Sequence, residues 1–124
     1  MDGYIAGVCN IGPSEIAARR RAGWIGLGVA AVLWVAFIAF RVPAAWRLTL
    51  FLPAAASASG FLQAALRFCA GFGTRGVFNF EAVGNTTDVP DAEAHRADRR
   101  KSLKIGAYSS LIGAAVALAG LLTA

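Results

Sequence analysis

Charged residues are scarce in this 124-residue sequence, at 15% of the chain, and three long stretches contain none. A soluble domain normally devotes about a quarter of its residues to Asp, Glu, Lys and Arg. Hydrophobic residues make up 57%, more than so short a chain can bury in its own interior. The composition therefore excludes an ordinary soluble domain and favours a chain solvated by lipid.

Cysteine and histidine are also rare, with Cys9, Cys69 and His95 as the full set. Two cysteines cannot build a disulfide framework, and no CxxC pair or Cys/His cluster indicates a zinc site. The first twenty residues lack a basic leader and a small-residue cleavage site, so we expect no cleavable signal peptide. No cofactor is predicted from these residues.

The three uncharged stretches are residues 22–40, 48–66 and 105–124. A helix of nineteen residues is about 28 Å long, which matches the hydrocarbon core of a bilayer. Buried helices of a soluble protein would show a polar stripe, and none does. We therefore predict an all-α integral membrane protein, one membrane domain with three transmembrane helices. Pro53 removes a backbone hydrogen bond and predicts a bend in the second.

Basic residues predict the orientation. Ten of the twelve Lys and Arg residues lie in or beside the N-terminal segment and the long loop 70–104. Only Arg41 and Arg47 lie on the opposite side. By the positive-inside rule the N-terminus and this loop are cytoplasmic and the C-terminus is outside. Arginine outnumbers lysine ten to two, which suggests a GC-rich bacterial source and hence the inner membrane.

The segments outside the bilayer have helical signals of their own. Pro13 and Glu15 are typical of a helix start, so we expect a short cytoplasmic N-terminal helix that continues into the first span. The apolar residues before it either rest at the interface or pack under the bundle. Residues 91–101 have acids before bases, which predicts a charged helix leading into the third span.

Three glycines of the loop, Gly71, Gly73 and Gly76, have the spacing GxGxxG. That spacing binds a pyrophosphate when it follows a strand and opens a helix. Here it follows a membrane span, so we interpret it as an irregular exit from the second helix.

Small residues recur every four positions in each span, and this spacing lets helices approach closely in lipid. Some of these surfaces are expected to meet another subunit, giving a homo-oligomer or a larger complex. The predicted packing residues are Gly26, Ala30, Ala56, Gly60, Ala64, Ser109, Gly113 and Ala117.

Polar side chains inside the spans are few. Ser57, Ser59 and Gln63 are expected to form interhelical hydrogen bonds, and no acid, lysine or histidine accompanies them. Proton-coupled transporters normally need such a group. An oligomeric small-solute transporter with Gln63 and Trp34 on its path is an open alternative.

Seven basic residues are predicted to contact anionic lipid rather than nucleic acid, because they border apolar runs instead of covering one soluble face. They are Arg19, Arg20, Arg21, Arg99, Arg100, Lys101 and Lys104.

Cys9 and Cys69 fall on the same predicted side of the membrane. Two thiolates could hold a soft metal such as Cu(I) or cycle through a disulfide. The main hypothesis is instead a non-catalytic subunit of a membrane assembly, because no catalytic cluster is apparent. The thiol-dependent carrier or redox protein is the second.

Overall fold

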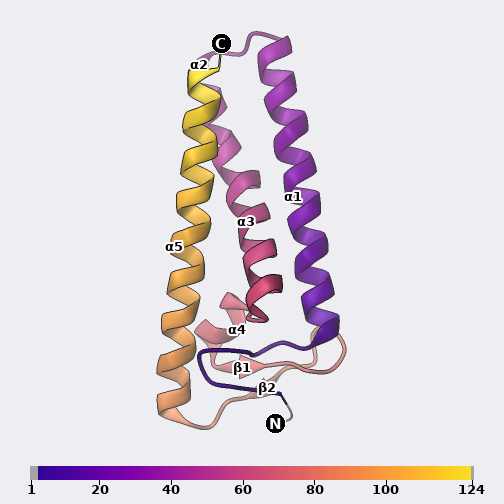
Figure 1. The fold of residues 1–124 in the computed structure, drawn as a ribbon, viewed down its shortest axis with the longest axis vertical. Coiled ribbons are helices and arrows are strands. Elements are labelled where there is room, and N and C mark those ends of the chain that lie inside the picture. Colours follow the sequence, from indigo (N-terminus) through magenta and orange to yellow (C-terminus); the bar gives the residue numbers. More distant parts are fainter. Residues whose placement is uncertain (1–2, 124) are drawn as a thin grey trace.

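The computed structural model describes residues 3–123 and is mostly helical (Figure 1). Three of its helical segments are long and apolar enough to cross a membrane, which confirms the predicted three-span architecture. In chain order the elements are α1 (Pro13–Ala39), α2 (Ala44–Arg47), the 3₁₀ turn η1 (Leu48–Leu50), α3 (Phe51–Leu66), α4 (Ala70–Arg75), β1 (Val77–Phe78), β2 (Thr87–Asp88) and α5 (Ala92–Leu122).

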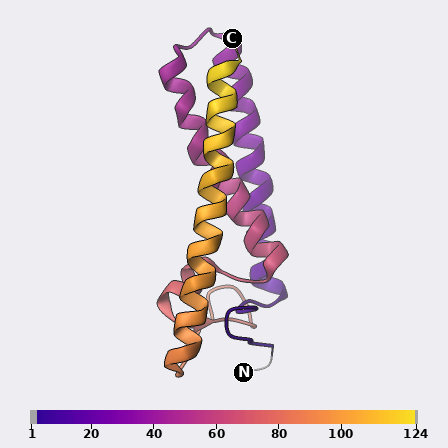
Figure 2. The same cartoon turned by 60° about the vertical axis from the view of Figure 1, so that its left-hand side comes forward.

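Helix α3 lies at the centre of the bundle, and both α1 and α5 pack against it (Figures 1 and 2). Glycines make this packing close. A Cβ atom on Gly60 would lie 2.6 Å from the backbone nitrogen of Gly23, and one on Gly113 would lie 2.8 Å from the Cβ of Ala55. In lipid, where no hydrophobic effect joins helices, such close approach supplies the van der Waals attraction.

Helix α1 begins where the sequence predicts. Pro13 occupies the first turn, where its missing N–H costs nothing, and Glu15 follows in the same turn. The helix then continues without a break into the apolar run that starts at Ala22. The expected N-terminal helix is therefore the beginning of the first span, and residues 13–21 extend it beyond the hydrocarbon.

Helix α5 also joins a charged segment to a membrane span, as predicted. Asp91 caps it, because its carboxylate accepts hydrogen bonds from the backbone N–H groups of Glu93 and Ala94. The helix runs from Ala92 through Lys104 to Leu122, so it begins well before the apolar stretch that starts at residue 105. Residue 124, the predicted end of that span, lies outside the described residues.

The second membrane segment, Ala44–Leu66, changes helix type along its length. A 3₁₀ turn, Leu48–Leu50, separates α2 from α3, and Pro53 lies in the first turn of α3. The helix therefore departs from α geometry just before Pro53, where the sequence predicted a disturbance.

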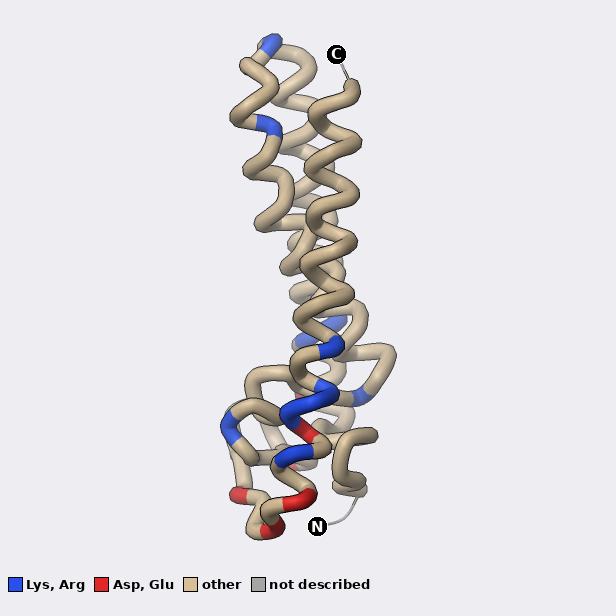
Figure 3. The backbone as a smooth tube through the Cα atoms, turned by 90° about the vertical axis from the view of Figure 1, so that its left-hand side faces the viewer, with Lys and Arg blue, Asp and Glu red and all other residues tan. Residues whose placement is uncertain are grey.

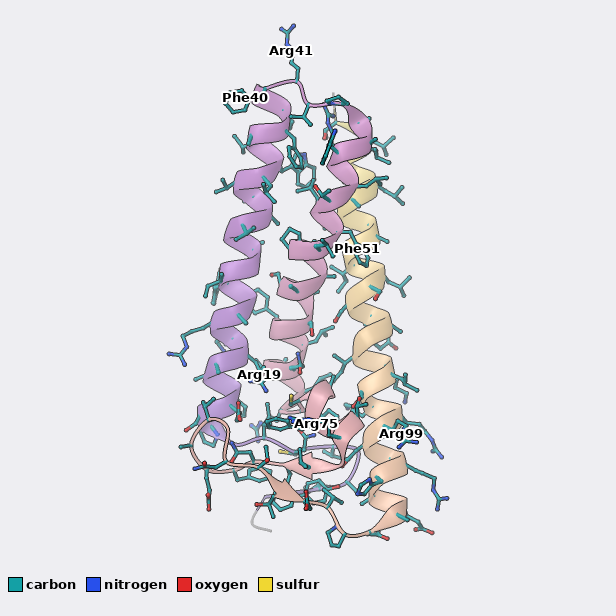
Figure 4. All side chains as sticks on the ribbon, turned by 180° about the vertical axis from the view of Figure 1, so that it is seen from behind. Arg19, Phe40, Arg41, Phe51, Arg75 and Arg99 are labelled. Carbon is teal, nitrogen blue, oxygen red and sulfur yellow. The ribbon has the colours of Figure 1, made fainter. Side chains whose placement is uncertain are left out.

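Charge divides the bundle into two ends (Figure 3). The end with the N-terminus carries all the described acids and most basic residues, and we call it the charged end. The other, the hairpin end, has Arg41 and Arg47. Arg41 has a positive φ of 52° in the tight turn and its side chain extends beyond the bundle (Figure 4).

Two features of the charged end differ from the prediction. Residues Val77–Phe78 and Thr87–Asp88 form a short antiparallel strand pair, which an all-α assignment does not include. The glycine-rich stretch is not an irregular exit, because Ala70–Arg75 forms α4. Gly73 lets α4 pack on α5, since a Cβ there would lie 2.9 Å from the carbonyl oxygen of Asp98.

Candidate functional site

A folded cap closes the charged end of the bundle. We use this name for residues 3–12 and 67–91, which lie at this end of the bundle, together with residues 92–98, the first turns of α5 (Figure 1). Backbone hydrogen bonds join its two parts: the N–H of Asn79 donates to the carbonyl of Asn10, and the N–H of Gly12 donates to the carbonyl of Asn79, both at 2.9 Å. Of the two alternatives for the N-terminal segment, packing under the bundle is correct.

Asn10 is the central polar residue of the cap and is fully buried. Its side-chain oxygen accepts from the backbone N–H of Cys69 at 2.6 Å, and its side-chain nitrogen donates to the carbonyl of Cys69 at 3.1 Å. Its own N–H donates to the carbonyl of Arg67. The carbonyl of Arg67 and the backbone groups of Cys69 lie just beyond the end of α3 and have no partner in that helix. Asn10 supplies hydrogen bonds to them, which buried backbone groups require.

Glu15 is a buried carboxylate at the start of α1, before the apolar run. It accepts hydrogen bonds from Arg19 at 2.9 Å, from the side chain of Asn79 at 2.9 Å and from the N–H of Gly84 at 3.1 Å. Burial by itself raises the pKa of Glu15, but these donors and the charge of Arg19 outweigh it and hold the pKa below its ordinary value. The Glu15 carboxylate therefore has its hydrogen-bonding needs met by the protein itself and serves a structural role.

Asp98 is the second buried carboxylate and anchors the N-terminal segment to α5. It accepts from the hydroxyl of Tyr4 and from the N–H of Gly7, both at 2.7 Å. Burial raises the pKa of Tyr4 well above its ordinary value, and the hydrogen bond and charge of Asp98 raise it further. Tyr4 also stacks on Phe78, with ring centroids 4.9 Å apart.

The two cysteines are free and have different partners. Cys69 is buried and accepts a hydrogen bond from Arg19 at 3.0 Å, whereas Cys9 is half-buried and donates to the carbonyl of Ile11 at 3.6 Å. Among residues 3–123 no group of three or more His, Cys, Asp or Glu side chains could hold a metal ion. The two-thiolate site stays a prediction.

Polar side chains within the spans bond to their own chain. Ser57 donates to the carbonyl of Gly23 at 2.7 Å, the expected interhelical bond. Gln63 instead bonds Ser59 in its own helix and accepts from the N–H of Ala70, so it closes the end of α3. Trp34 donates to the hydroxyl of Thr123 at 3.0 Å.

The predicted packing residues mostly face inward, so they join the three helices of one chain. Gly26, Ala30, Gly60, Ala64, Ser109, Gly113 and Ala117 are buried, whereas Ala56 is exposed on the outer side of α3. Ala54 and Ala58 are buried instead, and each lies two positions away from the four-residue repeat that the sequence suggests.

The predicted lipid-contacting arginines and lysines divide into two groups. Arg19 turns inward to Glu15 and Cys69 and lies over the ring of Phe72. Lys101 is half-buried, and the other five are exposed, as Figure 4 shows for Arg99: Arg20, Arg21, Arg99, Arg100 and Lys104. At the hairpin end, buried Arg47 donates to the carbonyls of Gly120 and Thr123 and so caps α5.

An open apolar groove lies at membrane depth between α1, α3 and α5. Its volume is about 540 Å³, within the range of about 300–1,000 Å³ common for small-ligand sites. Leu27, Ala31 and Trp34 line it from α1, Ala58 and Phe61 from α3, and Ile112 and Val116 from α5. It is a concave apolar surface that the spans offer to another molecule.

No family model, curated protein or solved structure matches this chain. Its function is therefore argued from its own residues.

Sequence reasoning missed the buried residues Asn10, Glu15, Asn79 and Asp98 as the centre of the cap. One signal was available in the sequence, because Asn79 stands between two phenylalanines in a segment that is otherwise apolar. The pairing of Asn10 with Cys69 had no local signal, since the two residues meet only after the chain has folded.

Proposed function

We propose that this multi-pass membrane protein is a non-catalytic component of a larger membrane assembly. The proposal includes its place in a bacterial inner membrane with the charged end in the cytoplasm, because the basic residues are so unequally divided between the two ends. The partner is a second copy of the chain or another membrane protein.

The buried polar residues support a structural role. Asn10, Glu15, Asn79 and Asp98 each bond to the chain's own backbone or side chains. A catalytic group needs free hydrogen-bonding capacity toward a substrate. These four residues instead use their capacity to hold the cap together, so the surfaces left for other molecules are the outer faces of the helices.

The outer face of α1 is the observation that carries the proposal. Helix α1 is the least buried of the three spans, and Ile25, Val32 and Val35 are about two-thirds exposed. Gly28 lies among them at helical spacing, and a Cβ built on it would meet nothing within 4 Å. A glycine surrounded by large apolar side chains on a lipid-facing surface lets the backbone of a neighbouring helix approach closely.

Two glycines allow a matched test. Gly28→Leu on α1 and Gly106→Leu on α5 both place a side chain in open space, so neither should disturb the monomer fold. The protein is purified in a mild detergent and its mass is measured. We expect the wild type and G106L to form the same complex and G28L to lose it.

Two results would overturn the proposal. A lone wild-type monomer without a bound protein would exclude an assembly that survives purification and oppose the proposal directly. A complex unaffected by G28L but lost in G106L would move the contact to α5 and reject the assignment of the α1 face.

A further inference from the structure

The membrane groove does not end at the hydrocarbon boundary. A second pocket, of about 680 Å³, lies at the charged end and is lined by Ile16, Arg20, Ala65, Arg67 and Phe80, among others. Ala65 lines both pockets. The apolar groove therefore adjoins, at Ala65, a pocket that two arginines line.

The same stripe of α1 runs along both pockets. Ile16, Arg20, Leu27, Ala31 and Trp34 are spaced so that they share one side of the helix. The rise from Arg20 to Trp34 is about 21 Å. This equals the thickness of one leaflet with its headgroup region, since a whole bilayer measures about 40–45 Å.

Arg20 and Arg67 are both exposed, and within residues 3–123 neither has an acidic partner, because the ion pair found there joins Arg19 to Glu15. A guanidinium presents its N–H donors in a planar fork that matches a phosphate. The second pocket thus presents two guanidinium groups that have no acidic partner among residues 3–123.

The backbone of Arg67 is unusual and firmly held. Its φ of 54° is left-handed, a conformation that glycine adopts at helix ends without cost. Its N–H donates to the carbonyl of Ala64 and its own carbonyl accepts from Asn10. The cap therefore fixes an arginine where local preference favours glycine, and such a departure points to a use for its side chain.

From these observations we propose that the groove is a binding site for one anionic phospholipid. An acyl chain lies along Leu27, Ala31, Phe61 and Val116, and the phosphate is bound by Arg20 and Arg67. The site differs from the outer face of α1, because Gly28, Ile25, Val32 and Val35 line neither pocket. The proposal is thus independent of the assembly.

Trp34 provides the probe, because it lines the groove. In a variant with Trp24→Phe and Trp46→Phe, Trp34 is the remaining tryptophan. This protein is reconstituted in phosphatidylcholine bilayers that contain a minor fraction of either brominated phosphatidylglycerol or brominated phosphatidylcholine. Bromine quenches tryptophan fluorescence on contact. We expect stronger quenching by the anionic lipid at equal mole fraction.

The charge dependence is tested with two matched pairs of substitutions. Arg20→Gln with Arg67→Gln removes the proposed phosphate ligands, and Arg99→Gln with Arg100→Gln removes two exposed arginines from the same end. The first pair should lower the preference for phosphatidylglycerol by about fivefold for each arginine. The second pair lines neither pocket, so its loss should leave the quenching of Trp34 in the groove unchanged.

Three outcomes would reject the site. Equal quenching by the two lipids would mean that the groove takes an acyl chain without regard to charge. Equal losses in both arginine pairs would mean general attraction of anionic lipid to a basic surface. No quenching by either lipid would mean that a protein segment, from a second copy or a partner, covers the groove.

Discussion

The guanidinium of Arg19 donates a hydrogen bond to the sulfur of Cys69 at 3.0 Å, across fifty positions of sequence. Arg19 simultaneously pairs with Glu15 in its own helix. One arginine thus ties the start of α1 to the exit of α3. Its position among basic residues that were predicted to contact lipid gave no sign of this inward role.

The cysteines should differ in reactivity. Cys69 is 5% exposed, whereas Cys9 is half-buried and lines the second pocket, the one at the charged end. We expect a maleimide added to the folded protein to label Cys9 much faster than Cys69, as measured by mass spectrometry of Cys9→Ser and Cys69→Ser. Equal rates would contradict this burial. Loss of bound Cu(I) or of a disulfide in both variants would instead support the thiol hypothesis.

Asn10→Ala should destabilise the cap strongly. It removes two side-chain hydrogen bonds and leaves the N–H and carbonyl of buried Cys69 without these partners. Each stranded group costs about 1–3 kcal/mol. Thermal unfolding in detergent should show the loss, with exposed Asn85→Ala as the control. A shift no larger than that of the control would disprove the role of Asn10.

Gly60→Ala should separate α1 from α3. The added methyl group would lie 2.6 Å from the nitrogen of Gly23 and 2.7 Å from the carbonyl oxygen of Arg19. Backbone atoms cannot move aside as a flexible side chain can, so we expect a loss of about 1–3 kcal/mol. Gly106→Ala meets open space and should be neutral or stabilising. Similar unfolding of both variants in detergent would refute this packing.

Tyr4 should resist ionisation in the folded protein. Burial raises its pKa most, and the hydrogen bond and charge of Asp98 raise it further, so neutral Tyr4 contributes its full stability below about pH 10, the ordinary tyrosine pKa. That stability is lost as the pH rises through the higher folded pKa. Phenolate absorbance, with Tyr4→Phe subtracted to remove Tyr108, should show late ionisation.

A conservative variant checks the cause of the shift. Asp98→Asn removes the negative charge and keeps the side-chain shape, so the pKa of Tyr4 should fall toward its ordinary value. If Tyr4 titrates alike in both proteins, the Asp98 contact does not control it.

The sequence by itself determined the three spans, because long uncharged stretches and their flanking arginines depend only on local composition and on the thickness of a bilayer. It also determined the starts of α1 and α5, since Pro13 and Asp91 act on the turn beside them. Only the tertiary structure decided the cap and the groove. Asn10 bonds to Cys69, Glu15 bonds to Asn79, and Arg20 of α1 lines a pocket together with Ala65 of α3. Such contacts join residues far apart in the chain, and their partners depend on which helix faces pack together, so no local pattern specifies them.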